Sequence, residues 1–419
     1  MDTMIYWIWL SLCCSPSGST FGKLIKEFDG ARAIYEADDK RISSIVGYRN
    51  SDRSALENKS LDKAEEIYAF CKKHKVGLLC YGDEKFPKAL RSIENPPVLL
   101  YYRGVLPDFN KIFAVSAVGT RALSDYGRKN AFRISYDLAT TGATVVSGMA
   151  MGIDGVAMAG AIAAGGKTVA VIGSGIDVCY PPQHLRLARE IVKNGCVLTE
   201  FAPGTPPSRY NFPKRNRIIS GLSAATVVFE GAEKSGALIT ARCAKEQGRA
   251  VYALPGNVGS VTSQLSSLLL KNGARICTSA DDILKDFTKE YGKIINPFLL
   301  KDRPTVDMMS TLTEYGVCAV CPNDDIFEVP RKRRQSDNTT AIFNRDDDVI
   351  EADIKAPPSD FDPRALKIYK KIPLSESCSI ESLVDGEMNL REVMKSLLKL
   401  EMGGFVRLLP GEMVSRKTN

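Results

Sequence analysis

The sequence lacks the motifs on which several common enzyme classes depend. Only two histidines, His74 and His184, occur in 419 residues, and neither has an obvious catalytic partner. There is no G-x-x-x-x-G-K-[ST] segment, which argues against P-loop ATP hydrolysis. The G-x-S-x-G turn of α/β-hydrolases is also missing, and Gly173-x-Gly175 lacks the third glycine of a dinucleotide fingerprint. We therefore expect no catalytic residues and no cofactor.

Membrane and metal signals are equally scarce. No apolar stretch approaches the roughly 20 residues that a membrane-spanning helix needs. The apolar run from Met4 to Cys14 follows Asp2 and has no Lys or Arg before it, so we expect a buried helix rather than a signal peptide. The 11 cysteines are scattered, mostly inside apolar runs, which favours reduced thiols in a cytoplasmic protein. Cys318 and Cys321 lack the second close pair of a zinc site, so no metal is expected.

Composition is that of an ordinary globular protein, with 44% hydrophobic and 25% charged residues. The 56 Lys and Arg exceed the 49 Asp and Glu by seven, which alone is a weak indication of a nucleic-acid partner. The length suggests two to four domains. Residues 1–75 are expected to form a small helical domain of the helix-hairpin-helix kind, because Phe21, Leu24, Ile25 and Phe28 recur at helical spacing.

The C-terminal third divides into two parts. Residues 291–358 lose the periodic pattern and carry the basic run Arg331–Arg334, which is typical of a mobile charged linker. Residues 359–419 are expected to form a compact winged-helix-like domain, which can bind either DNA or protein. The expected elements are a helix over 363–371, a second helix capped by Ser379, a third with its apolar face over 390–398, and a hairpin over 405–414.

Between these parts, residues 76–290 alternate β-rich runs with helical patterns. That rhythm predicts an α/β domain with a parallel sheet buried on both faces, an extended Rossmann-like core. Each run ends in a glycine or a Pro-Gly, and such turns can serve as anion sites, although plain strand-to-helix geometry also favours glycine. The predicted strands are 112–118, 144–147, 168–172, 225–229 and 250–254.

The segment 212–217, FPKRNR, is the most distinctive feature of the chain. It combines three cations with Phe212 and Asn216 within six residues. Residues 201–250 contain eight Lys or Arg and three Glu, so five of the seven excess positive charges lie there. Cations beside an aromatic ring suit single-stranded nucleic acid, because charge follows the backbone while a ring stacks on a base. A structural cluster of salt bridges is the alternative.

Several motifs, in this order, resemble the DprA/Smf family of DNA-processing proteins over residues 80–280. The resemblance implies a Rossmann domain that binds single-stranded DNA without catalysis, protects incoming strands and loads the RecA recombinase in natural transformation. It also implies a homodimer, and the flanking parts resemble the family's N-terminal SAM-like domain and C-terminal winged helix. The motifs are VGTR at 118–121, SGMAMGID at 147–154, VIGSGIDVCYP at 171–181, FPKRNRIISGLS at 212–223, SGALIT at 235–240 and ALPGN at 253–257.

By the same resemblance, one set of residues is expected to line a positive DNA pocket. Two departures from the family pattern stand out: His184 replaces the usual asparagine after YPxx, and the bulkier stretch 264–268 replaces a Gly-x-Asn. The second departure puts one wall of the pocket in doubt. The expected DNA-binding residues are Arg121, Ser147, Gly148, Phe212, Lys214, Arg215, Asn216, Arg217, Ser235, Gly236 and Thr240.

An enzyme on a related fold is the main alternative. Lysine-decarboxylase-like phosphoribohydrolases share a similar core and carry a catalytic glutamate in a GGxGTxxE motif. The corresponding stretch here, 235–241, has no glutamate at its end. That absence and the basic segment 212–217 favour DNA over a mononucleotide. A protein scaffold is a third possibility, and it predicts binding that survives high salt.

Overall fold

The structure is a computed structural model. It contains two compact units, Met1–Lys332 and Arg333–Asn419. No helix among the described residues is long and apolar enough to cross a membrane. The run Arg331–Arg334 and the pair Cys318 and Cys321 lie outside the described part. The described residues are 3–45, 50–301, 304–317, 361–372, 378–380, 383–384, 388, 390–403, 405–409 and 413–416.

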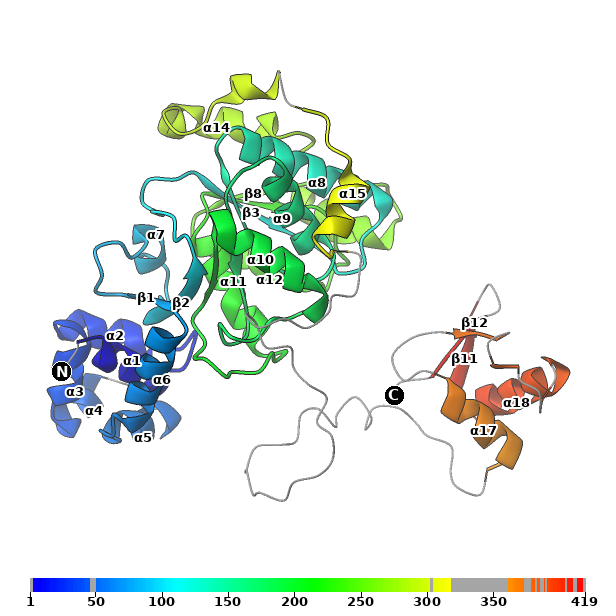
Figure 1. The fold of residues 1–419 in the computed structure, drawn as a ribbon, viewed down its shortest axis with the longest axis horizontal. Helices are drawn as coiled ribbons and strands as arrows, with labels where there is room; N and C mark the ends of the chain where they lie inside the picture. The colour runs from blue at the N-terminus through cyan, green and yellow to red at the C-terminus, as the bar shows by residue number, and fades with distance from the viewer. Residues whose placement is uncertain are drawn as a thin grey trace. The chain divides into compact units, whose positions relative to one another are not determined.

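The first unit begins with a group of short helices beside the β1–β2 edge of the sheet (Figure 1). The first helix is almost wholly buried, with Trp7 and Trp9 only 9% and 3% exposed. Trp9 Nε1 donates to the carbonyl of Asn58 at 2.9 Å. The apolar N-terminal run is therefore a core helix, as predicted. The helices are α1 (Thr3–Cys13), α2 (Thr20–Glu27), α3 (Gly30–Glu36), α4 (Asp39–Ile45), α5 (Asn50–Glu57) and α6 (Asp62–Lys73).

A nine-stranded sheet in the order β1-β2-β6-β5-β4-β3-β7-β8-β9 forms the centre of the first unit. All neighbours from β6 to β9 pair in parallel, so the predicted parallel core is confirmed. The five predicted strands are β3, β4, β5, β7 and β8, whereas β1, β2, β6 and β9 were missed. The strands are β1 (Gly77–Cys80), β2 (Leu99–Gly104), β3 (Ala114–Val118), β4 (Thr144–Ser147), β5 (Thr168–Val171), β6 (Cys196–Thr199), β7 (Ala225–Val228), β8 (Ala250–Ala253) and β9 (Arg275–Ile276).

Helices cover both faces of this sheet. Neighbouring residues of a strand point to opposite faces, so they belong to different cores. Val145 belongs to the core under α8, α9, α10 and α14, and Val146 to the core under α7, α11, α12 and α13. The helices are α7 (Lys88–Arg91), α8 (Asp125–Thr140), α9 (Ile153–Ala163), α10 (Leu185–Asn194), α11 (Asn211–Gly221), α12 (Gly236–Glu246), α13 (Gln264–Lys271) and α14 (Asp281–Tyr291), with 3-10 turns η1 (Pro182–His184) and η2 (Val261–Ser263).

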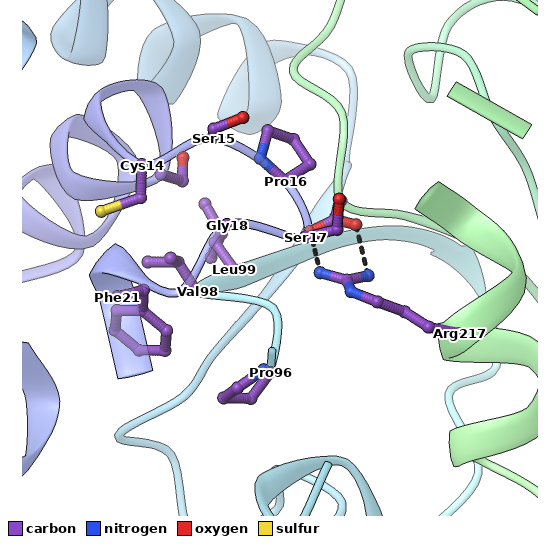
Figure 2. A pocket seen from close by; sticks show the side chains of 12 residues that line it. Cys14, Ser15, Pro16, Ser17, Gly18, Phe21, Pro96, Val98, Leu99 and Arg217 are labelled. Atoms are coloured by element: carbon purple, nitrogen blue, oxygen red, sulfur yellow. Dashed lines mark hydrogen bonds and ion pairs between the residues drawn. The ribbon is translucent and has the colours of Figure 1, made fainter. Parts of the chain in front are cut away.

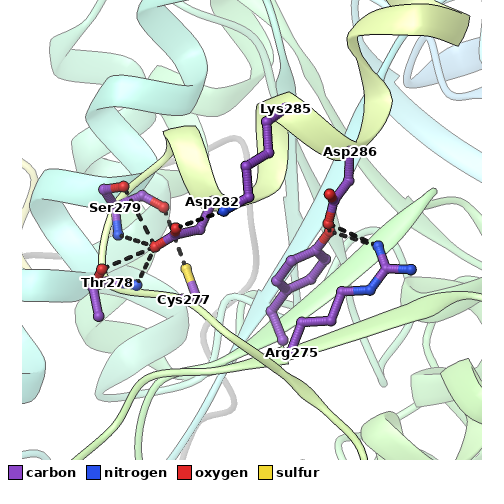
Figure 3. Close-up of polar contacts among 8 residues, drawn as sticks. Arg275, Cys277, Thr278, Ser279, Asp282, Lys285 and Asp286 are labelled. Atoms are coloured by element: carbon purple, nitrogen blue, oxygen red, sulfur yellow. Dashed lines mark hydrogen bonds and ion pairs between the residues drawn. The ribbon is translucent and has the colours of Figure 1, made fainter.

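Polar contacts attach α14 to the edge strand β9 (Figure 3). Asp286 accepts from Arg275 at 2.8 Å and from the Tyr252 hydroxyl at 2.6 Å. At the start of α14, Asp282 accepts from the backbone and hydroxyl of Thr278. Burial raises the pKa of Asp282, but these bonds and Lys285 outweigh it and hold the pKa at about 2.

The loss of periodicity placed the end of the α/β domain at residue 290, but the packed structure continues beyond that residue. Residues 291–301 and 304–317 continue along α8 and α9 and include η3 (Pro297–Leu300) and α15 (Met308–Glu314). Asn296 N donates to the carbonyl of Thr141 at 2.9 Å, and the Tyr136 hydroxyl donates to the carbonyl of Pro304 at 3.3 Å. Hydrophobic periodicity could not predict these contacts, because an irregular segment is held to the domain by hydrogen bonds of scattered polar groups.

The second unit contains two of the expected helices and the expected hairpin. Ser379 lies in a short strand, and the helix that it was expected to cap falls mostly outside the described residues, so that helix stays a prediction. The winged-helix assignment remains a prediction. The elements are α17 (Pro363–Lys371), β10 (Cys378–Ser379), α18 (Leu390–Met402), β11 (Val406–Leu409) and β12 (Met413–Arg416), with the strands ordered β10-β12-β11.

Candidate nucleic-acid interface

The order of strands in the sheet reverses between β3 and β7. From β3 the chain adds strands on one side as far as β6, and then returns through α11 so that β7 lies on the other side of β3. Ligands of open α/β sheets bind at this switch point. Thr120 N donates to the carbonyl of Glu230 at 2.8 Å, which ties together the turns after β3 and β7. Arg121 follows directly and so projects from the switch point.

Arg121 and Phe212 meet here, although they are 91 positions apart. The guanidinium carbon of Arg121, an exposed residue, lies 5.4 Å from the centre of the Phe212 ring at the start of α11. Tyr180 lies near the same ring, at 5.6 Å between ring centres, as do the guanidinium carbon of Arg215 at 5.9 Å and Gly173, where a Cβ would crowd the ring. Among the described residues, Arg121 has no ion-pair partner. Its charge therefore remains available to an anion.

Backbone donors and a second cation border the same edge. The helix α12 begins at Gly236, an exposed position with open space around it. Ser235 precedes it, makes no capping bond, and has a buried hydroxyl without a partner in the described structure. A helix N-terminus attracts anions through its unpaired N–H groups. Lys214 is half-buried on α11 and also lacks an ion-pair partner among the described residues.

Arg215 has an internal role rather than the predicted DNA contact. It is 4% exposed, and its Nη1 donates to the carbonyl of Gly148 at 2.7 Å and to that of Val171. Asp154 lies beside it and accepts from the N–H of Gly148 at 3.1 Å and of Ala150 at 3.4 Å. Burial lowers the pKa of Arg215 to about 10 and raises that of Asp154 to about 6, and each charge opposes the shift of the other. The pair holds the turn after β4 in place.

Arg217 also departs from the prediction, because its guanidinium is taken up by a carboxylate. Nη1 and Nη2 donate to the two oxygens of Glu200 at 2.6 and 2.8 Å, and the two side chains are only 9% and 7% exposed. Figure 2 shows Arg217 in a small pocket that also includes Ser17 and Pro96, on the side of the N-terminal helices. The alternative of a structural salt bridge therefore holds for this cation.

Three further predicted residues are turned inward. Ser147 is fully buried and donates to the carbonyl of Ala117 at 2.6 Å. Asn216 is 8% exposed, and its amide nitrogen lies 3.4 Å from the carbonyl of Gly236, which links α11 to α12. Thr240 is 2% exposed. Their side chains face the interior, so we no longer expect them to contact DNA.

The unusual stretch 264–268 closes against the end of β7. Leu265 is fully buried, and its N–H donates to the carbonyl of Gly231 at 2.9 Å. Next to it, Glu230 accepts from the N–H and hydroxyl of Ser124 at 2.9 and 2.5 Å and from Thr262 at 3.3 Å. The bulk of Leu265 thus points into the core. The stretch that departs from the family pattern therefore contributes apolar packing to the core.

His184, the other departure from the family pattern, supports the turn after β4. It is fully buried, and its Nδ1 lies 2.9 Å from the carbonyl of Met149, so Nδ1 carries the proton. Burial lowers the pKa of His184, which keeps the ring neutral. Met149 has a φ of +55°, a left-handed conformation that is uncommon outside glycine. Reasoning from sequence missed this role, and the signal was only the histidine in YPPQH.

The fold and the cations at this edge define the class of the protein: a doubly wound α/β domain with exposed basic side chains at its switch point. No group of three or more His, Cys, Asp or Glu in the described structure is placed to hold a metal ion. A family model described as DNA recombination-mediator protein A matches residues 77–288. The chain belongs to this family, the DprA/Smf proteins.

Relatives and a solved structure agree with that assignment. Protein Smf of Escherichia coli is 39% identical over 269 residues, which is 61% of this chain and 72% of the relative. Protein Smf of Synechocystis is 31% identical over 384 residues, or 90% of this chain and 87% of the relative. The X-ray structure of DprA from Streptococcus pneumoniae superposes with a TM-score of 0.59 and 35% identity, covering 68% of this chain and 99% of that one.

Proposed function

We propose that this protein binds single-stranded DNA at the β3–β7 switch point, without catalysis. The observation that carries the proposal is the exposed Arg121, which has no ion-pair partner in the described structure and lies beside the Phe212 ring. Lys214 and the N-terminus of α12 add a cation and unpaired N–H groups at the same edge. The family description, a DNA recombination mediator, agrees with such a site.

The wider role follows from the family resemblance. We propose that the protein protects incoming strands and loads RecA onto them in the cytoplasm, and that it acts as a homodimer. Catalysis is not part of the proposal, because the carboxylates near Arg121 already have structural partners. Glu230 accepts three hydrogen bonds, and Asp154 accepts two from the backbone. The phosphoribohydrolase alternative would need a free carboxylate in this position.

Affinity for a labelled poly-dT strand, measured at several salt concentrations beside a matched duplex, tests the proposal. For single strands, log affinity should fall with log salt by about 0.7 per phosphate contact. Arg121→Ala and Lys214→Ala should each reduce that slope by about 0.7 if each cation contacts one phosphate. Lys167→Ala is a matched control, because Lys167 is exposed just before β5, at the opposite edge of the sheet.

Two results would send us to another function. Equal affinity for strand and duplex, with slopes unchanged in both variants, would contradict a single-strand site at the switch point. Release of free base from nucleoside monophosphates by the purified protein would favour the phosphoribohydrolase alternative. Affinity for DNA that survives high salt would instead favour the protein-scaffold reading, since phosphate contacts are weakened by salt.

A further inference from the structure

A second aromatic ring stands at the entrance to α11, more exposed than the first. Tyr210 is 57% exposed and immediately precedes the helix, two residues before Phe212. Arg209 accompanies it: the guanidinium carbon lies 5.0 Å from the ring centre, and Nη2 donates to the Tyr210 hydroxyl at 3.0 Å. A single exposed ring is common, but exposed apolar side chains that gather on one face mark a binding surface.

The two rings differ in how much of each is already covered. Phe212 is half-buried between Tyr180, Gly173 and the guanidinium groups of Arg121 and Arg215. Tyr210 has a cation at its side and most of its surface in solvent. Two residues span at most about 7 Å of chain, so the two rings start from neighbouring points of the backbone.

Other apolar side chains are exposed on the loops and helix ends around the same edge of the sheet. Phosphates make no use of apolar surface, whereas the face of an unpaired base does. In a duplex the base faces are stacked on one another and hidden, so an apolar rim selects against it. These exposed side chains are Tyr126 (49%), Met151 (37%), Ile239 (36%), Val258 (100%) and Val261 (62%).

We infer that Tyr210 stacks on an unpaired base, that of a nucleotide next to the one held at Arg121. Arg209 places its charge at the hydroxyl edge of the ring, where it can meet the phosphate of the same nucleotide. This inference rests on the proposed function and adds to it a second base site. It also assigns the preference for single strands to contacts with bases rather than to charge alone.

The test compares two strands of equal length, one of poly-dT and one of abasic deoxyribose phosphate, which keeps the charge but has no bases. Tyr210→Ala should weaken binding of poly-dT by about 5- to 150-fold, the range for loss of one stacked base. It should change binding of the abasic strand by less than about twofold, because no ring contact is lost. Tyr210→Phe should restore binding of poly-dT.

A fluorescent variant gives an independent reading. In Tyr210→Trp, the new indole should be quenched by poly-dT and not by the abasic strand. The wild-type protein supplies the background, since Trp7 and Trp9 are buried among the N-terminal helices.

The inference is overturned if Tyr210→Ala binds poly-dT as tightly as the wild type, or if it loses the same factor on both strands. Absence of quenching in Tyr210→Trp bound to poly-dT would also overturn it. Failure of the proposed function looks different, because Arg121→Ala would then bind both strands as the wild type does.

Discussion

Replacing Arg217 by alanine should lower the free energy of unfolding without changing the two cations at the switch point, Arg121 and Lys214. The change removes two hydrogen bonds of 2.6 and 2.8 Å to Glu200 and leaves a carboxylate that is 7% exposed without its cation. Breaking a buried ion pair in this way costs about 3–5 kcal/mol. Because the pair borders a small pocket that water can enter, we expect the lower end, about 3 kcal/mol.

Urea denaturation followed by tryptophan fluorescence measures this loss. Both tryptophans, Trp7 and Trp9, lie in α1, next to the segment that lines the Arg217 pocket, so they report on the affected region. Arg121→Ala is the matched control, since an exposed arginine without an ion-pair partner should change the unfolding free energy by less than about 0.5 kcal/mol.

A second variant isolates the cause. Adding Glu200→Gln to Arg217→Ala should recover part of the lost stability, because the uncompensated charge is then gone. The reasoning is refuted by two results together. Arg217→Ala would unfold at the same urea concentration as the wild type, and the slope of log affinity for poly-dT against log salt would fall by about 0.7. That pair of results would make Arg217 a phosphate contact after all.

Three further outcomes are expected. Asp154 has a folded pKa of about 6, above its unfolded value of about 4, so its contribution to stability falls by roughly 3 kcal/mol as pH rises from 4 to 6. Asp154→Asn should remove this pH dependence of the unfolding free energy. The prediction is contradicted if the difference in unfolding free energy between wild type and variant is constant between about pH 4.5 and 7.5. Gly148→Ala should cost about 1–3 kcal/mol in urea, because a Cβ there overlaps the guanidinium of Arg215; wild-type stability would place Arg215 elsewhere. His184→Ala should cost about 1–3 kcal/mol by leaving the Met149 carbonyl unpaired, and an unchanged urea midpoint would rule out that hydrogen bond.

Patterns along the chain predicted the architecture of the core well. Strands buried on both faces read as short apolar runs, and glycines marked their carboxyl ends, so β3, β4, β5, β7 and β8 were all predicted. The missed strands β1 and β2 are antiparallel additions, and β9 has only two residues. The packed segment 291–317 escaped because its anchoring bonds follow no periodicity.

What the sequence by itself determined is the chemistry available: a parallel α/β core, five excess positive charges in residues 201–250, and the motifs that define the family. The sequence could not tell which of the three cations of FPKRNR face solvent and which are buried. Neighbouring residues on one helix point in different directions, about 100° apart per residue. Only the tertiary structure decided that Arg215 turns inward to Gly148 and that Arg217 meets Glu200. Lys214 and the distant Arg121 remain without ion-pair partners in the described part of the chain. Burial sets their roles, since a cation enclosed with a carboxylate or carbonyl is already satisfied, and only one facing solvent can still bind an anion.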